Sequence, residues 1–192
     1  MLLWYTARGA GFAALVLLTL ATAGGAVQSS RRLTPSQRVV LQYGHRAAAA
    51  AGLAVVVLHV ATIVADEYSG VGVLGALVPG ASGYRPWQVA LGTLAVYGFV
   101  AVAALGVARR RMAGSERGSR VWRGVHLLAY PCWAVAVLHG VTAGSDVGRV
   151  WAVALTVTCV AAVVGAAGFR LTGRRPAHVP VRRVPLLQEV LR

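Results

Sequence analysis

Hydrophobic and polar residues alternate in long blocks along this chain of 192 residues. A helix needs about 20 mostly apolar residues to cross a bilayer, and five blocks meet that requirement. They cover residues 9–27, 45–65, 87–108, 121–143 and 150–170. Short connections rich in arginine, glycine, proline and serine separate them. The pattern predicts an all-α bundle of five transmembrane helices, with residues 1–175 as one membrane domain and 176–192 as a basic cytoplasmic tail.

The composition agrees with this class of protein. Charged residues make up 12% of the chain, whereas a soluble domain carries about a quarter. All 19 basic residues are arginine, and no lysine occurs. Such a bias is typical of a GC-rich genome, so we expect a bacterial source, in particular an actinobacterium, and a multi-pass protein of the cell membrane.

The distribution of arginine predicts the orientation of the spans, because cytoplasmic loops carry an excess of basic residues. Sixteen arginines fall on one side of the predicted bundle and three, Arg8, Arg85 and Arg149, on the other. The sixteen are Arg31, Arg32, Arg38, Arg46, Arg109, Arg110, Arg111, Arg117, Arg120, Arg123, Arg170, Arg174, Arg175, Arg182, Arg183 and Arg192. We therefore expect the N-terminus outside and the C-terminus inside. The net charge of +14 then reflects topology, and nucleic acid is not an expected partner.

The first apolar block has a second interpretation. Arg8, the apolar run after it and the small residues Ala21-Thr22-Ala23 resemble a secretory signal with its cleavage site. Cleavage there would leave the basic 28–46 loop outside, against the arginine rule. Retention of the first span is the favoured interpretation.

Four of the five histidines lie on two of the predicted spans. His45 and His59 are separated by 14 residues, and His126 and His139 by 13. A histidine inside a membrane is costly unless it is paired or ligated. At 1.5 Å per residue, each spacing covers about 20 Å along a helix. Because the two helices are parallel, His45 is expected to face His126 and His59 to face His139, each pair ligating one haem iron.

The helical phase differs between the two spans. Fourteen residues at about 100° each place His45 and His59 on nearly one face, whereas thirteen leave His126 and His139 about 140° apart on an ideal helix. Pro131 lies between the latter two and is expected to bend this helix. Local overwinding would close part of the gap.

Other residues on these spans have alternative interpretations. Trp133 lies midway between His126 and His139, where an aromatic side chain could separate two haem edges, although packing is the favoured interpretation. Gly52 lies halfway between His45 and His59; it either allows close helix packing or admits a haem edge. The two cysteines, Cys132 and Cys159, are expected to act as small hydrophobic residues in the bundle.

Haem propionates would need polar partners at each end of the bundle. Arg46 and Arg123 are the candidates near the inner histidine pair, although orientation and lipid headgroups also explain them. Arg85 is the outer candidate. Asp146 could serve the outer face, but a solvated loop residue is the favoured interpretation. His178 lies between Pro176 and Pro180 in the polar tail, so it is excluded as a ligand.

The chain resembles the ferric-reductase-like transmembrane domain family, which includes NADPH oxidases, ferric reductases and the haem subunit of a periplasmic methionine sulfoxide reductase system. Three segments are similar: His45-Arg46 with His59 downstream, VPGASGYRPWQVALG at 78–92, and WRGVHLLAYPCWAVAVLHGVTAGSD at 122–146. The resemblance covers nearly the whole chain.

The resemblance implies a membrane cytochrome with two bis-histidine b haems, which passes electrons to ferric iron, oxygen or a partner reductase outside the cell. The chain departs from the family by showing five spans instead of six, without a counterpart of the first. It also has no Gly-rich phosphate loop, so a separate donor, either a flavoprotein or a membrane quinol, is expected. The chain would thus be a component of an oxidoreductase, surrounded by membrane lipid.

Two other classes of protein remain as alternatives. Intramembrane histidines also relay protons or bind metal ions in transporters and channels. The sequence shows no inverted repeat and no buried carboxylate to partner the histidines, so this interpretation is less favoured. A structural scaffold would leave the paired histidines unexplained.

Overall fold

The computed structural model describes residues 1–112 and 114–172. Four long helices cross the bundle: α1 (Leu2–Gln28), α2 (Pro35–Ala65), α4 (Pro86–Met112) and α7 (Val150–Leu171). A fifth crossing consists of two consecutive helices, α5 (Glu116–Leu127) and α6 (Ala129–Ala143). Two short elements, η1 (Glu67–Ser69) and α3 (Gly72–Leu77), connect α2 to α4. All five crossings are long and apolar enough to span a membrane, and no strand occurs among the described residues, which confirms the predicted all-α bundle.

The second helix begins ten residues before the apolar block that predicted it. Thr34 and Gln37 form a capping box in which Thr34 Oγ1 accepts from the Gln37 backbone N–H at 3.3 Å, and Gln37 Oε1 accepts from the Thr34 N–H at 3.0 Å. Pro35 occupies the first helical turn, where its missing N–H costs nothing. The cap lets the polar segment before His45 continue the same helix, so His45 lies inside regular structure.

The crossing that carries His126 and His139 is interrupted at Leu128. The Leu128 N–H bonds to the Val125 carbonyl at 2.9 Å, which is the three-residue spacing of a tighter helical turn. Pro131 has no N–H to offer the Leu127 carbonyl, and its ring crowds that carbonyl. The helix is thus overwound just before Pro131, in the direction that reduces the expected phase difference between the two histidines.

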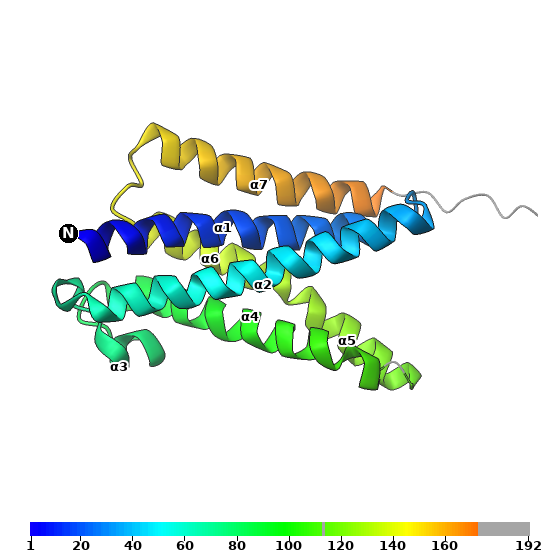
Figure 1. Cartoon of the computed structure of the whole chain (residues 1–192), viewed down its shortest axis with the longest axis horizontal. Helices are drawn as coiled ribbons and strands as arrows, with labels where there is room; N and C mark the ends of the chain where they lie inside the picture. The colour runs from blue at the N-terminus through cyan, green and yellow to red at the C-terminus, as the bar shows by residue number, and fades with distance from the viewer. Residues whose placement is uncertain (113, 173–192) are drawn as a thin grey trace, which may run out of the picture.

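Figure 1 shows how the helices are arranged around α1, which lies between α2 and α7 and also contacts α6. A core cluster joins four crossings, namely Leu18 of α1, Phe99 of α4, Trp133 of α6, and Cys159 and Val163 of α7. Small buried residues of α1, including Ala7, Ala10 and Ala14, allow close approach of the backbones, as is usual for helices in lipid.

The connections fall at two ends of the bundle (Figure 1). The N-terminus, the α2–α4 connection and the α6–α7 connection lie at one end, and the α1–α2 and α4–α5 connections lie at the other with the end of α7. The two arginine-rich connections therefore share one end. Assignment of that end to the cytoplasm rests on the arginine rule and stays a prediction.

Candidate haem site

The structure brings the four membrane histidines together as two facing pairs. His45 of α2 faces His126 of α5, with ring centroids 5.9 Å apart and ring planes at 71°. His59 of α2 faces His139 of α6, with centroids 6.5 Å apart and planes at 74°. We call His45 and His126 the inner pair, and His59 and His139 the outer pair. Because of the overwound turn at Leu128, His126 and His139, which lie on the same crossing, both face α2.

Both separations suit two imidazoles that share one metal ion. A ring nitrogen lies about 2.0–2.1 Å from a ligated first-row metal and about 1.1 Å from its ring centre, so two axial rings have centroids roughly 6.4 Å apart. A porphyrin supplies the other four ligands, so a haem iron needs no third side chain. Within residues 1–112 and 114–172, no group of three or more His, Cys, Asp or Glu side chains could hold a metal ion.

Three of the four imidazoles are held by a backbone carbonyl through Nδ1. His45 bonds to the Ala21 carbonyl at 2.7 Å and His59 to the Ala7 carbonyl at 2.7 Å, both on α1. His139 bonds to the Gln88 carbonyl of α4 at 2.8 Å. Because a carbonyl only accepts, Nδ1 must carry the proton, which leaves Nε2 with a lone pair for a metal. This second hydrogen bond is the usual way in which a protein orients a ligating histidine.

These contacts also bear on the first apolar block. Both carbonyls that hold the α2 histidines belong to α1, and both come from its buried small residues. Cleavage after Ala23 would remove Ala7 and Ala21 and, with them, two of the three anchors. Retention of this span stays a prediction.

His126 has different surroundings from the other three histidines. Its Nδ1 is buried without a hydrogen-bond partner, and so is Nε1 of Trp122. The two rings are stacked, with centroids 5.0 Å apart and planes at 18°. The guanidinium of Arg109 lies 4.5 Å from the centre of the Trp122 ring. Trp122 and His126 are four residues apart on α5, the spacing at which helical side chains are neighbours, whereas no sequence pattern links Arg109 to them. The stack places a cation and an indole beside the inner pair.

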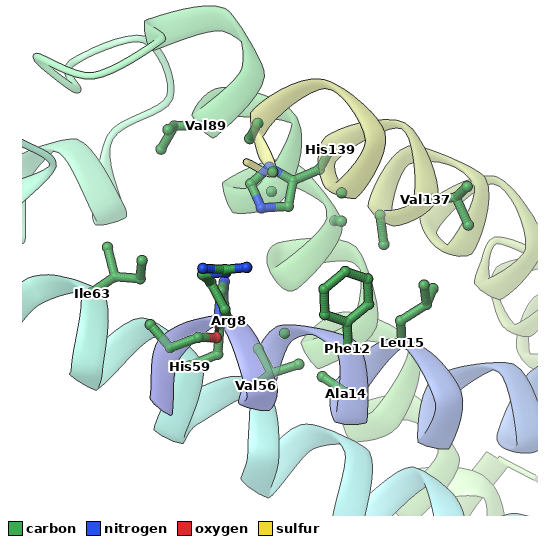
Figure 2. A pocket seen from close by; sticks show the side chains of 18 of the residues that line it. Arg8, Phe12, Ala14, Leu15, Val56, His59, Ile63, Val89, Val137 and His139 are labelled. Carbon is green, nitrogen blue, oxygen red and sulfur yellow. Dashed lines mark hydrogen bonds between the residues drawn. The ribbon is translucent and has the colours of Figure 1, made fainter. Parts of the chain in front are cut away.

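A cavity of about 510 Å³ opens at the outer pair. Its lining is mostly apolar and includes Phe12, Phe99 and Val137 as well as the two histidines. Figure 2 shows His59 and His139 directed into this space from opposite helices, with the side chains of Arg8 and Phe12 also reaching toward it. A volume of this size and an apolar wall with few polar groups are typical of cofactor sites.

Trp133 belongs to both the core and the cavity wall. It is 6% exposed, packs in the cluster of Leu18 and Phe99, and donates through Nε1 to Thr19 Oγ1 at 2.9 Å. It also lines the cavity. The packing interpretation is thus confirmed, and the side chain additionally borders the candidate haem site.

The charged residues that line the outer cavity differ from the candidate that the sequence suggested. Arg85 is exposed, donates to the Thr142 carbonyl at 2.6 Å and does not line the cavity. Arg8 lines it instead and forms an ion pair with Asp146, to whose Oδ2 its Nε donates at 2.7 Å. Asp146 is 6% exposed, so its interpretation as a solvated loop residue was wrong: a cation from α1 compensates its burial. No sequence pattern links two residues 138 positions apart.

Arg46 and Arg123 remain close in sequence to the inner pair, but both side chains are exposed. Neither lines the outer cavity. Their assignment as propionate partners stays a prediction.

Gly52 serves helix packing. A Cβ at this position would lie 3.0 Å from Leu18 Cδ2 and 3.4 Å from Leu17 Cβ, so the missing side chain lets α1 approach α2. Cys132 and Cys159 are free thiols, with Cys159 in the core cluster and Cys132 packed against it, as expected for small hydrophobic residues. His178 and the basic tail lie outside the described residues.

No protein-family model, curated protein or solved structure matches this chain.

Proposed function

We propose that this chain is a membrane cytochrome b subunit that carries electrons across the bilayer through two bis-histidine haems. The outer pair would ligate one haem iron and the inner pair the other. The observation that carries the proposal is the facing of both pairs at centroid separations of 5.9 and 6.5 Å, close to the roughly 6.4 Å estimated for two axial imidazoles.

The protein residues would bind and orient the cofactors. Haem b held by these histidines would supply one-electron redox chemistry at each end of the bundle. His45 and His59 are separated by about 20 Å along α2, which places one site toward each end of the bundle. Ala7, Ala21 and Gln88 hold three of the four rings through their carbonyls.

Charged groups near each pair support the same proposal. Arg8 lies in the wall of the outer cavity, and Arg109 lies over the Trp122 ring beside the inner pair. Guanidinium groups bind carboxylates well, so each is a candidate partner for haem propionates. An arginine near a haem also shifts its reduction potential, since local charge is one of the controls on potential.

The donor and acceptor are proposed from the resemblance. Electrons would enter from a separate flavoprotein or a membrane quinol at the arginine-rich end and leave at the other end to ferric iron, oxygen or a partner reductase. Flavin, where it takes part, would belong to that donor protein. Chemistry at the acceptor would depend on what reaches the outer haem.

An absorption spectrum of the purified protein tests the proposal. Reduction with dithionite should give sharp b-type bands, and the pyridine haemochrome assay should find two haems per chain. His59→Ala should remove the outer haem and His45→Ala the inner one, each leaving one haem. His178→Ala, in the tail, is the matched control and should retain both.

Two results would contradict the proposal at different points. Protein without a Soret band, after expression with sufficient haem, would exclude a cytochrome and favour the transporter or scaffold classes. Equal loss of both haems from His45→Ala and His59→Ala, with the fold retained, would refute the pairing while leaving haem binding intact.

A further inference from the structure

Three glycines lie directly against the histidine rings. A Cβ built on Gly11 would lie 3.2 Å from Cε1 of His59, and one on Gly25 would lie 3.2 Å from Cε1 of His45. At Gly92 it would lie only 2.8 Å from Cε1 and 2.9 Å from Nδ1 of His139. Real Cβ atoms essentially never approach heavy atoms closer than 3.0 Å.

Each glycine follows the carbonyl that holds its histidine by four residues. The carbonyls belong to Ala7, Ala21 and Gln88, and the glycines are residues 11, 25 and 92. Four residues is the spacing at which a helical carbonyl accepts a hydrogen bond from a backbone N–H of the same helix. The same local arrangement thus occurs three times, twice on α1 and once on α4.

The repeat on α1 matches the repeat on α2. Gly11 and Gly25 are 14 residues apart, as are His45 and His59. The helices are antiparallel (Figure 1), so Gly25 meets His45 and Gly11 meets His59. The same 14-residue spacing on both helices therefore places one glycine of α1 against each histidine of α2.

A physical reason connects glycine to the carbonyl four residues earlier. The Cα–Cβ bond in a helix points toward the N-terminus, so a side chain covers the turn before it and the carbonyl that this turn exposes. A carbonyl oxygen has two lone pairs, of which the helix uses one. Removal of Cβ opens the second lone pair to a neighbouring helix, and here imidazole Nδ1 occupies that space.

We infer that Gly11, Gly25 and Gly92 are positioning residues. They determine the orientation of the ring plane of each haem-ligating imidazole and keep its proton on Nδ1. The inference rests on the proposed function. Each glycine admits one ring to a carbonyl, and the hydrogen bond fixes both its rotation about the iron–nitrogen direction and its Nδ1–H tautomer. Since the two members of the outer pair are fixed by different helices, α1 and α4, their planes are held at 74°.

Two properties of the iron report on this role. The angle between axial imidazole planes controls the anisotropy of the low-spin ferric EPR spectrum, and rings near perpendicular give a larger spread of g values than parallel rings. Hydrogen bonding from Nδ1 makes the imidazole a stronger donor to iron, which favours the ferric state and lowers the reduction potential. Loss of a carbonyl contact should reduce the anisotropy or raise the potential of that haem alone.

The test compares alanine at each contact glycine with alanine at a nearby free glycine, in the full-length, haem-loaded protein. Gly11→Ala should change the EPR signal and raise the midpoint potential of the outer haem, while Gly9→Ala, with nothing within 4 Å of its Cβ, should match the wild type. Gly25→Ala should change the inner haem only. Its control is Gly24→Ala, whose Cβ would meet only His45 Cβ at 4.0 Å.

The third glycine provides a check on another helix. Gly92→Ala should shift the outer haem most strongly or cause its loss, because its Cβ contacts are the shortest of the three. Gly106 lies 14 residues later on α4, and its Cβ would have no neighbour within 4 Å. Gly106→Ala is therefore the control, and it should leave both signals unchanged.

The outcomes distinguish this inference from the proposed function. A wild-type protein without haem overturns the proposed function. Two haems in the wild type, with a shift or loss confined to the haem beside the altered glycine, support the positioning role. Contact and control variants that behave alike, or Gly11→Ala and Gly25→Ala that affect the same haem, overturn the positioning role while haem binding stands.

Discussion

Removal of Arg8 and removal of Asp146 from their ion pair are expected to lower the free energy of unfolding by different amounts. The ion pair joins α1 to the connection between α6 and α7 in the wall of the outer cavity. The Asp146 side chain is 8% exposed, whereas that of Arg8 is 30% exposed. The guanidinium also lies 5.8 Å from the ring centres of Trp4 and Tyr5. Arg8 thus keeps other favourable surroundings when its partner is lost, and Asp146 does not.

The magnitude follows from these exposures. Removing one partner of a fully buried pair costs about 3–5 kcal/mol. Arg8→Gln leaves a nearly buried carboxylate without its cation, and solvent near Arg8 reduces the penalty, so we expect a loss of about 2–3 kcal/mol in the free energy of unfolding. Asp146→Asn removes the charge but keeps the shape and an acceptor oxygen, and Arg8 is partly solvated, so the expected loss is about 1 kcal/mol.

Thermal unfolding in detergent, followed by circular dichroism at matched haem content, measures the difference. For a chain of this size, 1 kcal/mol corresponds to roughly 2–4 °C. Arg8→Gln should lower Tm by roughly 4–12 °C and Asp146→Asn by roughly 2–4 °C. The double variant should be more stable than Arg8→Gln alone, because it removes the uncompensated charge. Equal losses for the two single variants, or a double loss equal to their sum, would refute this account.

Two further predictions concern packing between helices. Gly52→Ala should cost about 1–3 kcal/mol, because the new methyl group would press on Leu18 in the α1–α2 contact, whereas Gly44→Ala on the same helix meets nothing within 4 Å and should be neutral or slightly stabilising; similar Tm values for both would contradict the close contact. Thr19→Val should cost about 1–3 kcal/mol by leaving the buried Nε1 of Trp133 without an acceptor, while Thr19→Ser, which keeps the hydroxyl, should recover most of the loss in the same melting experiment.

The apolar blocks were sufficient to predict the five crossings, because each exceeds the length that lipid requires. They were insufficient to locate helix ends. α2 extends through a polar segment that only the Thr34 capping box explains, and hydropathy does not record caps. The interruption at Leu128 agrees with the bend expected from Pro131, because a proline ring crowds the carbonyls on its N-terminal side.

Histidine spacing predicted which rings face each other, because helical rise and parallel direction limit the choices. The groups that hold those rings were missed, although a signal was present: glycines 14 residues apart on the first span repeat the spacing of His45 and His59 on the second. The Arg8–Asp146 pair had no such signal. Its two residues meet because the N-terminal part of α1 and the α6–α7 connection lie at the same end of the bundle.

The carbonyl contacts tie the histidines into two units, which meet at the proposed cofactors and also in the core cluster of Leu18, Phe99 and Trp133. Within the first unit, α1 holds both α2 histidines, and within the second, α4 holds His139 of α6. Each unit is a hairpin of neighbouring crossings, and each facing pair takes one ring from either hairpin. Under the proposed function, the two irons would bridge these two hairpins. Haem that binds only the assembled subunit would then stabilise the association of the two hairpins by mass action.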